Sequence, residues 1–333
     1  MNQKDTQPLR YYDVFNGDAD GIFALHQLRL ARPVDNNTLI TGVKRDIALL
    51  KKIRDIKNCR ITVFDVSLDK NRDELIELLE RKNRILYFDH HFAGNIPDAD
   101  TLEQHIQPSA HTCTSLIVNE LLQGKYSKWA VCGAFGDNLD EQATTLAASM
   151  AMSESDLEAL KEMGELFNYN GYGSKIEDLH FHPAKLYEAI QPFADPLDFY
   201  SSTDIVLQLR DGFVADMANA ADSKNLSTRD PHRLYILPAA PWARRIAGVF
   251  SNHKAREKPQ AAHAVMVKND DGTLQISVRA PLDDKRNADT LCRQFPSGGG
   301  RAAAAGVNHL PENMLDEFTE AFHTIFSDTS SND

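Results

Sequence analysis

Short apolar runs alternate with amphipathic stretches along the first part of the chain. Four runs are rich in β-branched and aromatic residues, as buried strands are: residues 11–15, 38–41, 61–64 and 85–88. Three intervening segments have the spacing of amphipathic helices: residues 22–30, 47–56 and 68–81. Strands that alternate with helices form right-handed βαβ units around a parallel sheet. The pattern therefore predicts an α/β fold with an N-terminal doubly wound parallel sheet.

The pattern changes in the second part of the chain. Helical composition dominates residues 139–166, and residues 168–173 and 180–183 carry loop signals. We expect residues 1–214 to form one domain, residues 215–230 a polar linker, residues 231–327 a smaller α/β domain and residues 328–333 a tail. In the smaller domain three segments are expected to be strands: residues 234–237, 264–267 and 274–279. Residues 269–272 predict a hairpin turn, and residues 288–295 and 312–326 predict helices.

Acidic residues and histidines follow several of the predicted strands. Asp18 and Asp20 come after the first, Asp65 after the third, and Asp89-His90-His91 after the fourth. Ligands bind at the carboxyl ends of the strands in open α/β sheets. Oxygen and imidazole ligands without thiolates suit a hard divalent ion such as Mn²⁺. Asp137 follows a further buried apolar segment and completes the candidate metal ligands.

Three consecutive glycines stand near the C-terminus of the chain. Gly298, Gly299 and Gly300 precede Arg301 and an alanine-rich run, which predicts a helix opened by the glycines. Backbone N–H groups at a helix N-terminus bind phosphate, and Arg301 would add a fork of donors. Arg279, at the end of a predicted strand, is a second candidate phosphate ligand.

Charge and composition restrict the classes of partner. The net charge is −12, and residues 231–333 are balanced, so the first part carries the excess with 24 basic and 36 acidic residues. A long nucleic acid normally requires a basic stripe, so we expect no long duplex as partner. The four cysteines form no CxxC pair, and the polar start of the chain lacks a signal-peptide core. A cytoplasmic protein without membrane spans is expected.

The ordered set of motifs resembles the DHH phosphoesterase superfamily, in the DHH–DHHA1 subgroup of RecJ exonucleases, nanoRNases and dinucleotide hydrolases. Residues 16–21 match the first motif and Asp65 the second. Asp89-His90-His91 matches the third, and residues 136–138 the fourth. Arg279 and the Gly298–Arg301 run match the substrate motif of the C-terminal domain. The resemblance covers nearly the whole chain.

The resemblance implies a phosphodiesterase with two Mn²⁺ ions, Mg²⁺ or Co²⁺ being alternatives, in a cleft between the two domains. The metal ligands would be Asp18, Asp20, Asp65, His90 and Asp137. His91 would contact the substrate phosphate or protonate the leaving group, because successive side chains on extended backbone point apart. Asp89 would orient the histidines.

The sequence departs from the family pattern at two places. Val14 stands where nanoRNase-like members have a histidine, and Asn16 stands where RecJ-like members have an acidic residue, so Asn16 is an additional candidate ligand. Arg301 replaces the commoner histidine after the three glycines and cannot titrate near neutral pH.

Several functions stay open at this point. The first expectation is hydrolysis of very short RNA, with linear dinucleotides such as pGpG, the breakdown product of cyclic di-GMP, cleaved to mononucleotides. A 3′-phosphoadenosine 5′-phosphate phosphatase and a single-strand exonuclease are alternatives. A nucleotide-binding regulator without catalysis represents another class. The oligomeric state, monomer or homodimer, is not specified by the sequence.

Overall fold

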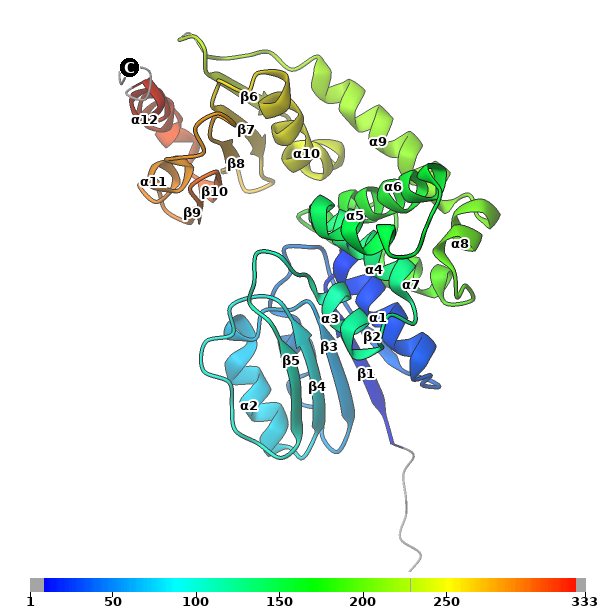
Figure 1. Cartoon of the computed structure of the whole chain (residues 1–333). Helices are drawn as coiled ribbons and strands as arrows, with labels where there is room; N and C mark the ends of the chain where they lie inside the picture. The colour runs from blue at the N-terminus through cyan, green and yellow to red at the C-terminus, as the bar shows by residue number, and fades with distance from the viewer. Residues whose placement is uncertain (1–8, 228, 328–333) are drawn as a thin grey trace, which may run out of the picture. The chain divides into compact units, whose positions relative to one another are not determined.

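The chain forms two compact units in a computed structural model that describes residues 9–227 and 229–327 (Figure 1). The first unit extends to Arg210 and the second begins at Asp211. The long helix α9 (Ile205–Ala221) contains this boundary. It occupies the first part of the expected linker, residues 215–230.

A five-stranded parallel sheet forms the centre of the first unit, with the order β2-β1-β3-β4-β5. Its strands are β1 (Tyr11–Phe15), β2 (Thr38–Ile40), β3 (Arg60–Phe64), β4 (Arg84–Asp89) and β5 (Leu102–Ile106). The four predicted strands are confirmed. The edge strand β5 was not predicted because its sequence, LEQHI, has three consecutive polar residues and lacks β-branched residues until its end.

Helices cover both faces of this sheet. On one face α2 (Arg72–Glu80) packs Leu75 and Leu78 into a core with Val63 and Tyr87. On the other face lie α1 (Ala19–Ala31) and α3 (Thr114–Leu121) (Figure 1). The remaining α-helices of the unit are α4 (Ser127–Gly136), α5 (Asp140–Ala148), α6 (Glu154–Gly171), α7 (Pro183–Ile190) and α8 (Pro196–Ser202). Short 3₁₀ turns occupy Leu49–Ile53, Asp69–Asn71 and Ile176–Asp178.

Glycines allow α1, α4 and α6 to approach at backbone distance. A Cβ added to Gly164 of α6 would lie 2.2 Å from the carbonyl oxygen of Cys132 in α4. A Cβ on Gly136 would lie 2.4 Å from the Cβ of Ala19 in α1. This close packing brings the C-terminus of α4, where Asp137 is the C-cap, next to the start of α1.

Two local predictions in the first unit are wrong. Residues 47–56 form only the single 3₁₀ turn, whose buried leucines serve as core residues of a connecting segment. Residues 168–171 were expected to be a loop, but they complete α6. Asn168 and Asn170 are buried there and hydrogen-bonded, which offsets their poor helix propensity.

The second unit has a mixed five-stranded sheet with the order β6-β7-β8-β10-β9, in which only β6 and β7 are parallel. Its strands are β6 (Arg233–Leu237), β7 (His263–Lys268), β8 (Leu274–Arg279), β9 (Gly298–Arg301) and β10 (Ala304–Leu310). Its helices are α10 (Pro241–Glu257), α11 (Ala288–Cys292) and α12 (Leu315–Ser327), with a 3₁₀ turn at Glu312–Met314. Phe318 and Phe322 of α12 pack with Val278 and Val307 of the sheet in the core of the unit.

The glycine run does not open a helix, so that prediction is wrong. Gly298–Arg301 is the edge strand β9, which pairs with β10. A Cβ on Gly298 would lie 1.8 Å from the carbonyl oxygen of Cys292, and Gly300 has φ +141°. The glycines therefore permit close backbone contact and a left-handed conformation, whereas the alanines suggested a helix through their intrinsic propensity.

Within the described ranges, no helix combines the length and apolar character needed to cross a membrane.

Candidate metal centre

The carboxyl ends of β1, β3 and β4 meet at one edge of the parallel sheet, and the polar residues after them gather there. Two sets of side chains each bring three potential ligand atoms within 4.8 Å of one another. One set is Asp20, His90 and Asp137, and the other is Asp65, His90 and His91. His90 belongs to both, so the two sets form one continuous cluster. Five of the sequence-predicted residues therefore come together in space, although they are widely separated along the chain, and Asp18 belongs to neither set.

Asp20 fixes the first helix against α3. Its two carboxylate oxygens accept hydrogen bonds of 2.7 Å from the backbone N–H groups of Thr114 and Ser115. These groups lie in the first turn of α3, where unpaired N–H groups and the positive end of the helix dipole favour an anion. Asp20 is 1% exposed, and burial, with the nearby Asp65 carboxylate, raises its pKa to about 6.

Asp65 and His90 face each other at 3.3 Å, measured from His90 Nε2 to Asp65 Oδ1. Asp65 has φ +55°, a conformation that aspartate tolerates better than most residues, and Thr114 Oγ1 donates to its carboxylate. His90 Nδ1 lies 3.0 Å from the carbonyl oxygen of Thr112, so Nδ1 is the donor and Nε2 faces the carboxylates. A histidine held in this way presents one ring nitrogen to a metal ion.

His91, a member of the second ligand set, is also hydrogen-bonded to Asp89. His91 Nδ1 lies 2.6 Å from Oδ1 of Asp89, which is fully buried and also accepts from the backbone N–H of His91. The expectation that His91 points away from His90 is wrong, because their ring centroids lie 4.5 Å apart. Strand β4 ends at Asp89, so the alternation of side chains along extended backbone does not apply to the histidines.

Lys44 is part of the centre, although the sequence argument did not include it. Its ammonium lies 2.6 Å from Oδ2 of Asp18 and 3.9 Å from Oδ1 of Asp137, and it donates to Oδ1 of Asn168 at 2.8 Å. Lys44 follows β2, so its position after a predicted strand was the available signal. Asp18 itself caps α1 by accepting from the N–H of Gly21.

The charges of the cluster are incompletely balanced in the protein alone. Burial raises the pKa of Asp137 to about 6 against the opposing effect of Lys44. Burial also raises the pKa of Asp65. Burial by itself lowers the pKa of His90. Asp65 and the other carboxylates outweigh this effect and raise the pKa to about 10. Closely spaced buried carboxylates of this kind favour a divalent cation.

A small cavity of 280 Å³ opens onto these groups, and Asn16 lines it. Asn16 is 6% exposed, and its Oδ1 has no hydrogen-bond partner among the described residues, while its Nδ2 donates to the carbonyl oxygen of Lys44. A buried amide oxygen without a donor is an unused ligand atom. Together with the converging carboxylates and Nε2 of His90, it makes the donor set of the cavity suitable for a hard cation.

The predicted phosphate ligands lie in the second unit. Arg279 of β8 and Arg301 of β9 both pair with Ala304 of the intervening strand β10. Residues directly opposite each other in antiparallel strands point to the same face, so the two arginines flank one alanine on one face of the sheet. Asn252 of α10 accepts from Arg279 Nε at 2.6 Å and orients its guanidinium.

Residues 180–183, which carry loop signals in the sequence, include His180 and His182. The histidines of the His-x-His sequence stabilise local structure, as expected for a helix-linking loop: His180 Nε2 lies 2.8 Å from the Tyr169 hydroxyl, and His182 caps α7. Tyr169 is 1% exposed and packs in the core. The ring of Tyr172 lies 5.3 Å from the Lys44 ammonium.

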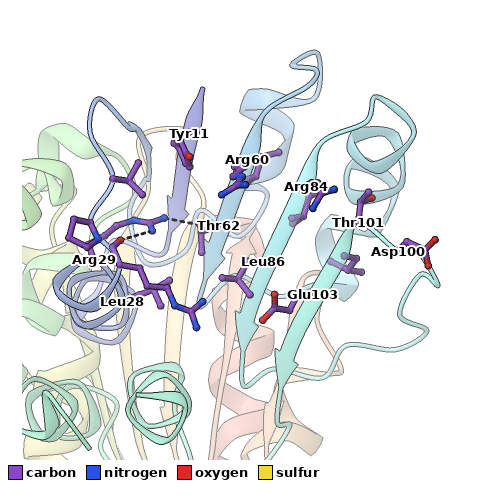
Figure 2. A pocket seen from close by; sticks show the side chains of 16 residues that line it. Tyr11, Leu28, Arg29, Arg60, Thr62, Arg84, Leu86, Asp100, Thr101 and Glu103 are labelled. Atoms are coloured by element: carbon purple, nitrogen blue, oxygen red, sulfur yellow. Dashed lines mark hydrogen bonds between the residues drawn. The ribbon is translucent and has the colours of Figure 1, made fainter. Parts of the chain in front are cut away.

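A larger hollow, of 470 Å³, lies at the opposite end of the same sheet (Figure 2). Arg60 and Arg84, the first residues of β3 and β4, line it together with Arg29 and Thr62. Arg29 donates to Thr62 (Figure 2). Arg29 also donates to Asp13. The groups that could hold a metal lie at the other end of the strands, so this hollow is not the candidate metal centre.

Comparisons with solved structures identify the fold. A DHH-domain protein described as a member of a family of ribosomal proteins has a TM-score of 0.66 at 15% identity, covering 95% of this chain and 86% of its own. The exonuclease RecJ bound to manganese has a TM-score of 0.61 at 14% identity over 96% of this chain and 90% of its own. The chain has the DHH-domain fold.

Two further structures share the DHH fold. RecJ from Thermus thermophilus in complex with Mn²⁺ has a TM-score of 0.57 at 17% identity, covering 96% of this chain and 52% of its own. An exopolyphosphatase-related protein from Bacteroides fragilis has a TM-score of 0.51 at 13% identity, covering 96% and 92%. No protein-family model matches the sequence, and the search of curated proteins found no relative.

Proposed function

We propose that the protein is a metal-dependent phosphodiesterase that hydrolyses very short oligoribonucleotides, with linear dinucleotides such as pGpG as the preferred class. The observation that carries the proposal is the convergence of two ligand sets that share His90: one adds Asp20 and Asp137, and the other adds Asp65 and His91. RecJ structures of the same fold are described with Mn²⁺ or Mg²⁺.

Each residue of the centre has its own role in the proposed reaction. Asp20, Asp65, His90 and Asp137 would hold a divalent ion, which would polarise the phosphate and lower the pKa of a water molecule. In hydrolysis the water oxygen forms a bond to phosphorus, the P–O bond to the departing nucleotide breaks, and the departing 3′-oxygen takes up a proton. His91 is 44% exposed in its side chain and is the proposed proton donor. Burial opposes its charged form, but the hydrogen bond to Asp89 prevails and raises the pKa of His91.

Size and charge support a small substrate. A cavity of 280 Å³ is slightly below the range for ligand sites, about 300–1,000 Å³, and suits a phosphodiester of a short substrate better than a long strand. Proteins bind long nucleic acids tightly when basic side chains neutralise many phosphates and release their counterions. A net charge of −12 is unfavourable for this kind of binding.

A hydrolysis panel with purified full chain and Mn²⁺ tests the proposal. The substrates are pGpG, other dinucleotides, RNA of 3–10 nucleotides and 3′-phosphoadenosine 5′-phosphate. We expect dinucleotides to be cleaved fastest, with kcat/KM falling as length increases. Faster cleavage of the longer RNAs would indicate a single-strand exonuclease, and preference for 3′-phosphoadenosine 5′-phosphate would indicate a phosphatase. Nucleotide binding without turnover of any substrate would contradict an enzymatic function.

His91→Gln tests the proposed proton donor. We expect kcat on pGpG to fall about 10²-fold to 10⁴-fold, the range for loss of a general acid. The loss should be much smaller for a dinucleotide analogue whose leaving group is p-nitrophenolate, because this group departs without protonation. His105→Gln, a matched change at a partly buried histidine outside the cavity, should retain wild-type rates. An equal loss on both substrates would assign His91 to binding or metal coordination instead.

A further inference from the structure

Asp18 was predicted to be a metal ligand, but its carboxylate binds groups of the protein itself. Neither set of converging ligand atoms includes it. One of its oxygens accepts from the N–H of Gly21 at 3.1 Å, and the other lies 2.6 Å from the Lys44 ammonium. Both oxygens are therefore occupied by groups of the chain, and one partner is a cation, whereas Asp20 accepts from two neutral backbone N–H groups.

Lys44 reaches Asp18 from a backbone that is fixed on both sides. Its N–H donates to the carbonyl oxygen of Gly171 at 2.9 Å, at the end of α6, and its own carbonyl oxygen accepts from Asn16 Nδ2 at 3.2 Å. The side chain is 22% exposed, and its ammonium is held between Asp18 and Oδ1 of Asn168. The backbone contacts with Gly171 and Asn16 and the side-chain contacts with Asp18 and Asn168 together hold the ammonium at the centre.

The ammonium lies where a second cation would need to bind. A cation held by Asp18 would lie next to the ammonium, and like charges at this distance repel strongly in a buried site. The remaining candidate ligand there, Asn16, is neutral and offers one free oxygen. The two ligand sets that share His90 are better supplied: one has two carboxylates and an imidazole, and the other has one carboxylate and two imidazoles.

We propose that Lys44 replaces one of two metal ions: the centre binds a single divalent ion beside His90, through carboxylates of the two ligand sets that share this histidine, and the Lys44 ammonium supplies the second positive charge to the substrate phosphate. An ammonium has three N–H donors. Two are directed to Asp18 and Asn168, and the third is available for a non-bridging phosphate oxygen in the cavity that Lys44 lines. The catalytic part rests on the proposed phosphodiesterase function, whereas the number of ions does not.

Metal stoichiometry tests the number of ions without reference to activity. We expect titration calorimetry of the metal-free full chain with Mn²⁺ to give one ion per chain. Electron paramagnetic resonance should show the spectrum of an isolated Mn²⁺ ion. Two ions about 3.5–4 Å apart, as in two-metal sites, would give a spin-coupled spectrum. Two ions per chain with spin coupling would overturn the proposal, because Lys44 would then be displaced.

Lys44→Gln tests the second positive charge. Glutamine keeps a polar group of similar reach, so the variant should fold and bind one Mn²⁺ ion as tightly as the wild type or more tightly, which the titration checks. We expect kcat/KM on pGpG to fall about 10²-fold to 10³-fold, as for loss of one charge-stabilising donor, and Lys44→Arg to recover part of it. Lys51→Gln, an exposed lysine of the neighbouring turn, is the matched control and should behave as wild type.

The two proposals fail in distinguishable ways. Wild-type hydrolysis by Lys44→Gln, with one ion bound, would overturn the role of Lys44 and leave the phosphodiesterase proposal intact. If wild-type protein hydrolyses no substrate of the panel, the phosphodiesterase proposal fails, and the ion count still decides whether Lys44 excludes a second ion.

Discussion

Asp65→Asn is expected to abolish Mn²⁺ binding at micromolar concentrations and to lower hydrolysis of pGpG by about 10³-fold or more, a loss at least as large as that of a single catalytic electrostatic group. Asp65 lies opposite Nε2 of His90 at 3.3 Å and belongs to the cluster proposed to hold the ion. Asparagine has the same shape and also tolerates the left-handed backbone conformation at φ +55°, so the fold should survive. The change removes one negative charge and little else.

Titration calorimetry with Mn²⁺ and steady-state kinetics measure this outcome. Asp55→Asn is the matched control, because Asp55 is 84% exposed in its side chain and lies outside the cavity. It should retain wild-type affinity and rate. Full Mn²⁺-dependent activity in Asp65→Asn, with circular dichroism confirming the same fold, would remove Asp65 from the metal ligands.

Metal removal is expected to destabilise the first unit at pH 7.5 much more than at pH 5. The pKa values of Asp20 and Asp137 are raised to about 6 in the metal-free protein, against 3.8 as the ordinary value. A carboxyl group with a raised pKa favours the folded state fully below 3.8, and this contribution is lost as the pH rises through 6. A shift of about two pKa units corresponds to roughly 3 kcal/mol for one group, an upper bound because the two groups interact.

Charged His90 gives a stabilisation with the same pH dependence. Its pKa is about 10 in the folded protein against the ordinary value of 6.5, so the stabilisation is complete below pH 6.5 and is lost as the pH rises through 10. Mn²⁺ at about 100 times its Kd should stabilise the folded state by about 2.7 kcal/mol. This corresponds to a rise in Tm of about 5–10 °C for a unit of this size. The rise should shrink at pH 5, where protons compete for the carboxylates.

Calorimetric melting with EDTA or Mn²⁺ at pH 5, 6 and 7.5 measures these effects. Asp20→Asn should flatten the pH dependence of the metal-free protein, because one of the two titrating carboxyl groups is gone. A Tm that is unaffected by Mn²⁺ at pH 7.5 would contradict metal binding at the cluster.

The parallel sheet and the position of the centre could be predicted from the sequence because both depend on local signals. Apolar β-branched runs mark the strands, and the edge at which Asp20, Asp65 and His90 meet follows from the parallel topology. The cleft between domains, the substrate and the roles of Arg279 and Arg301 stay predictions.

The features that escaped prediction depend on tertiary contacts. Asn168 is a poor helix former, yet it continues α6 because its side chain binds the Lys44 ammonium. Gly300 precedes alanines that favour a helix, but pairing with β10 imposes a strand. Lys44 lies between Asp18 and Asn168, which are far apart in the sequence. The periodicity of apolar residues carries no information about such contacts.

The burial of α1 has a consequence for the dynamics of the centre. All ten residues from Ala19 to Leu28 are buried, so the helix that begins at Asp18 and carries Asp20 has no solvent-facing side over its first turns. Its amide hydrogens should exchange with deuterium only when the whole first unit unfolds, even without metal. The centre is then preorganised before any ion or substrate arrives, and binding requires little rearrangement of the backbone that carries it.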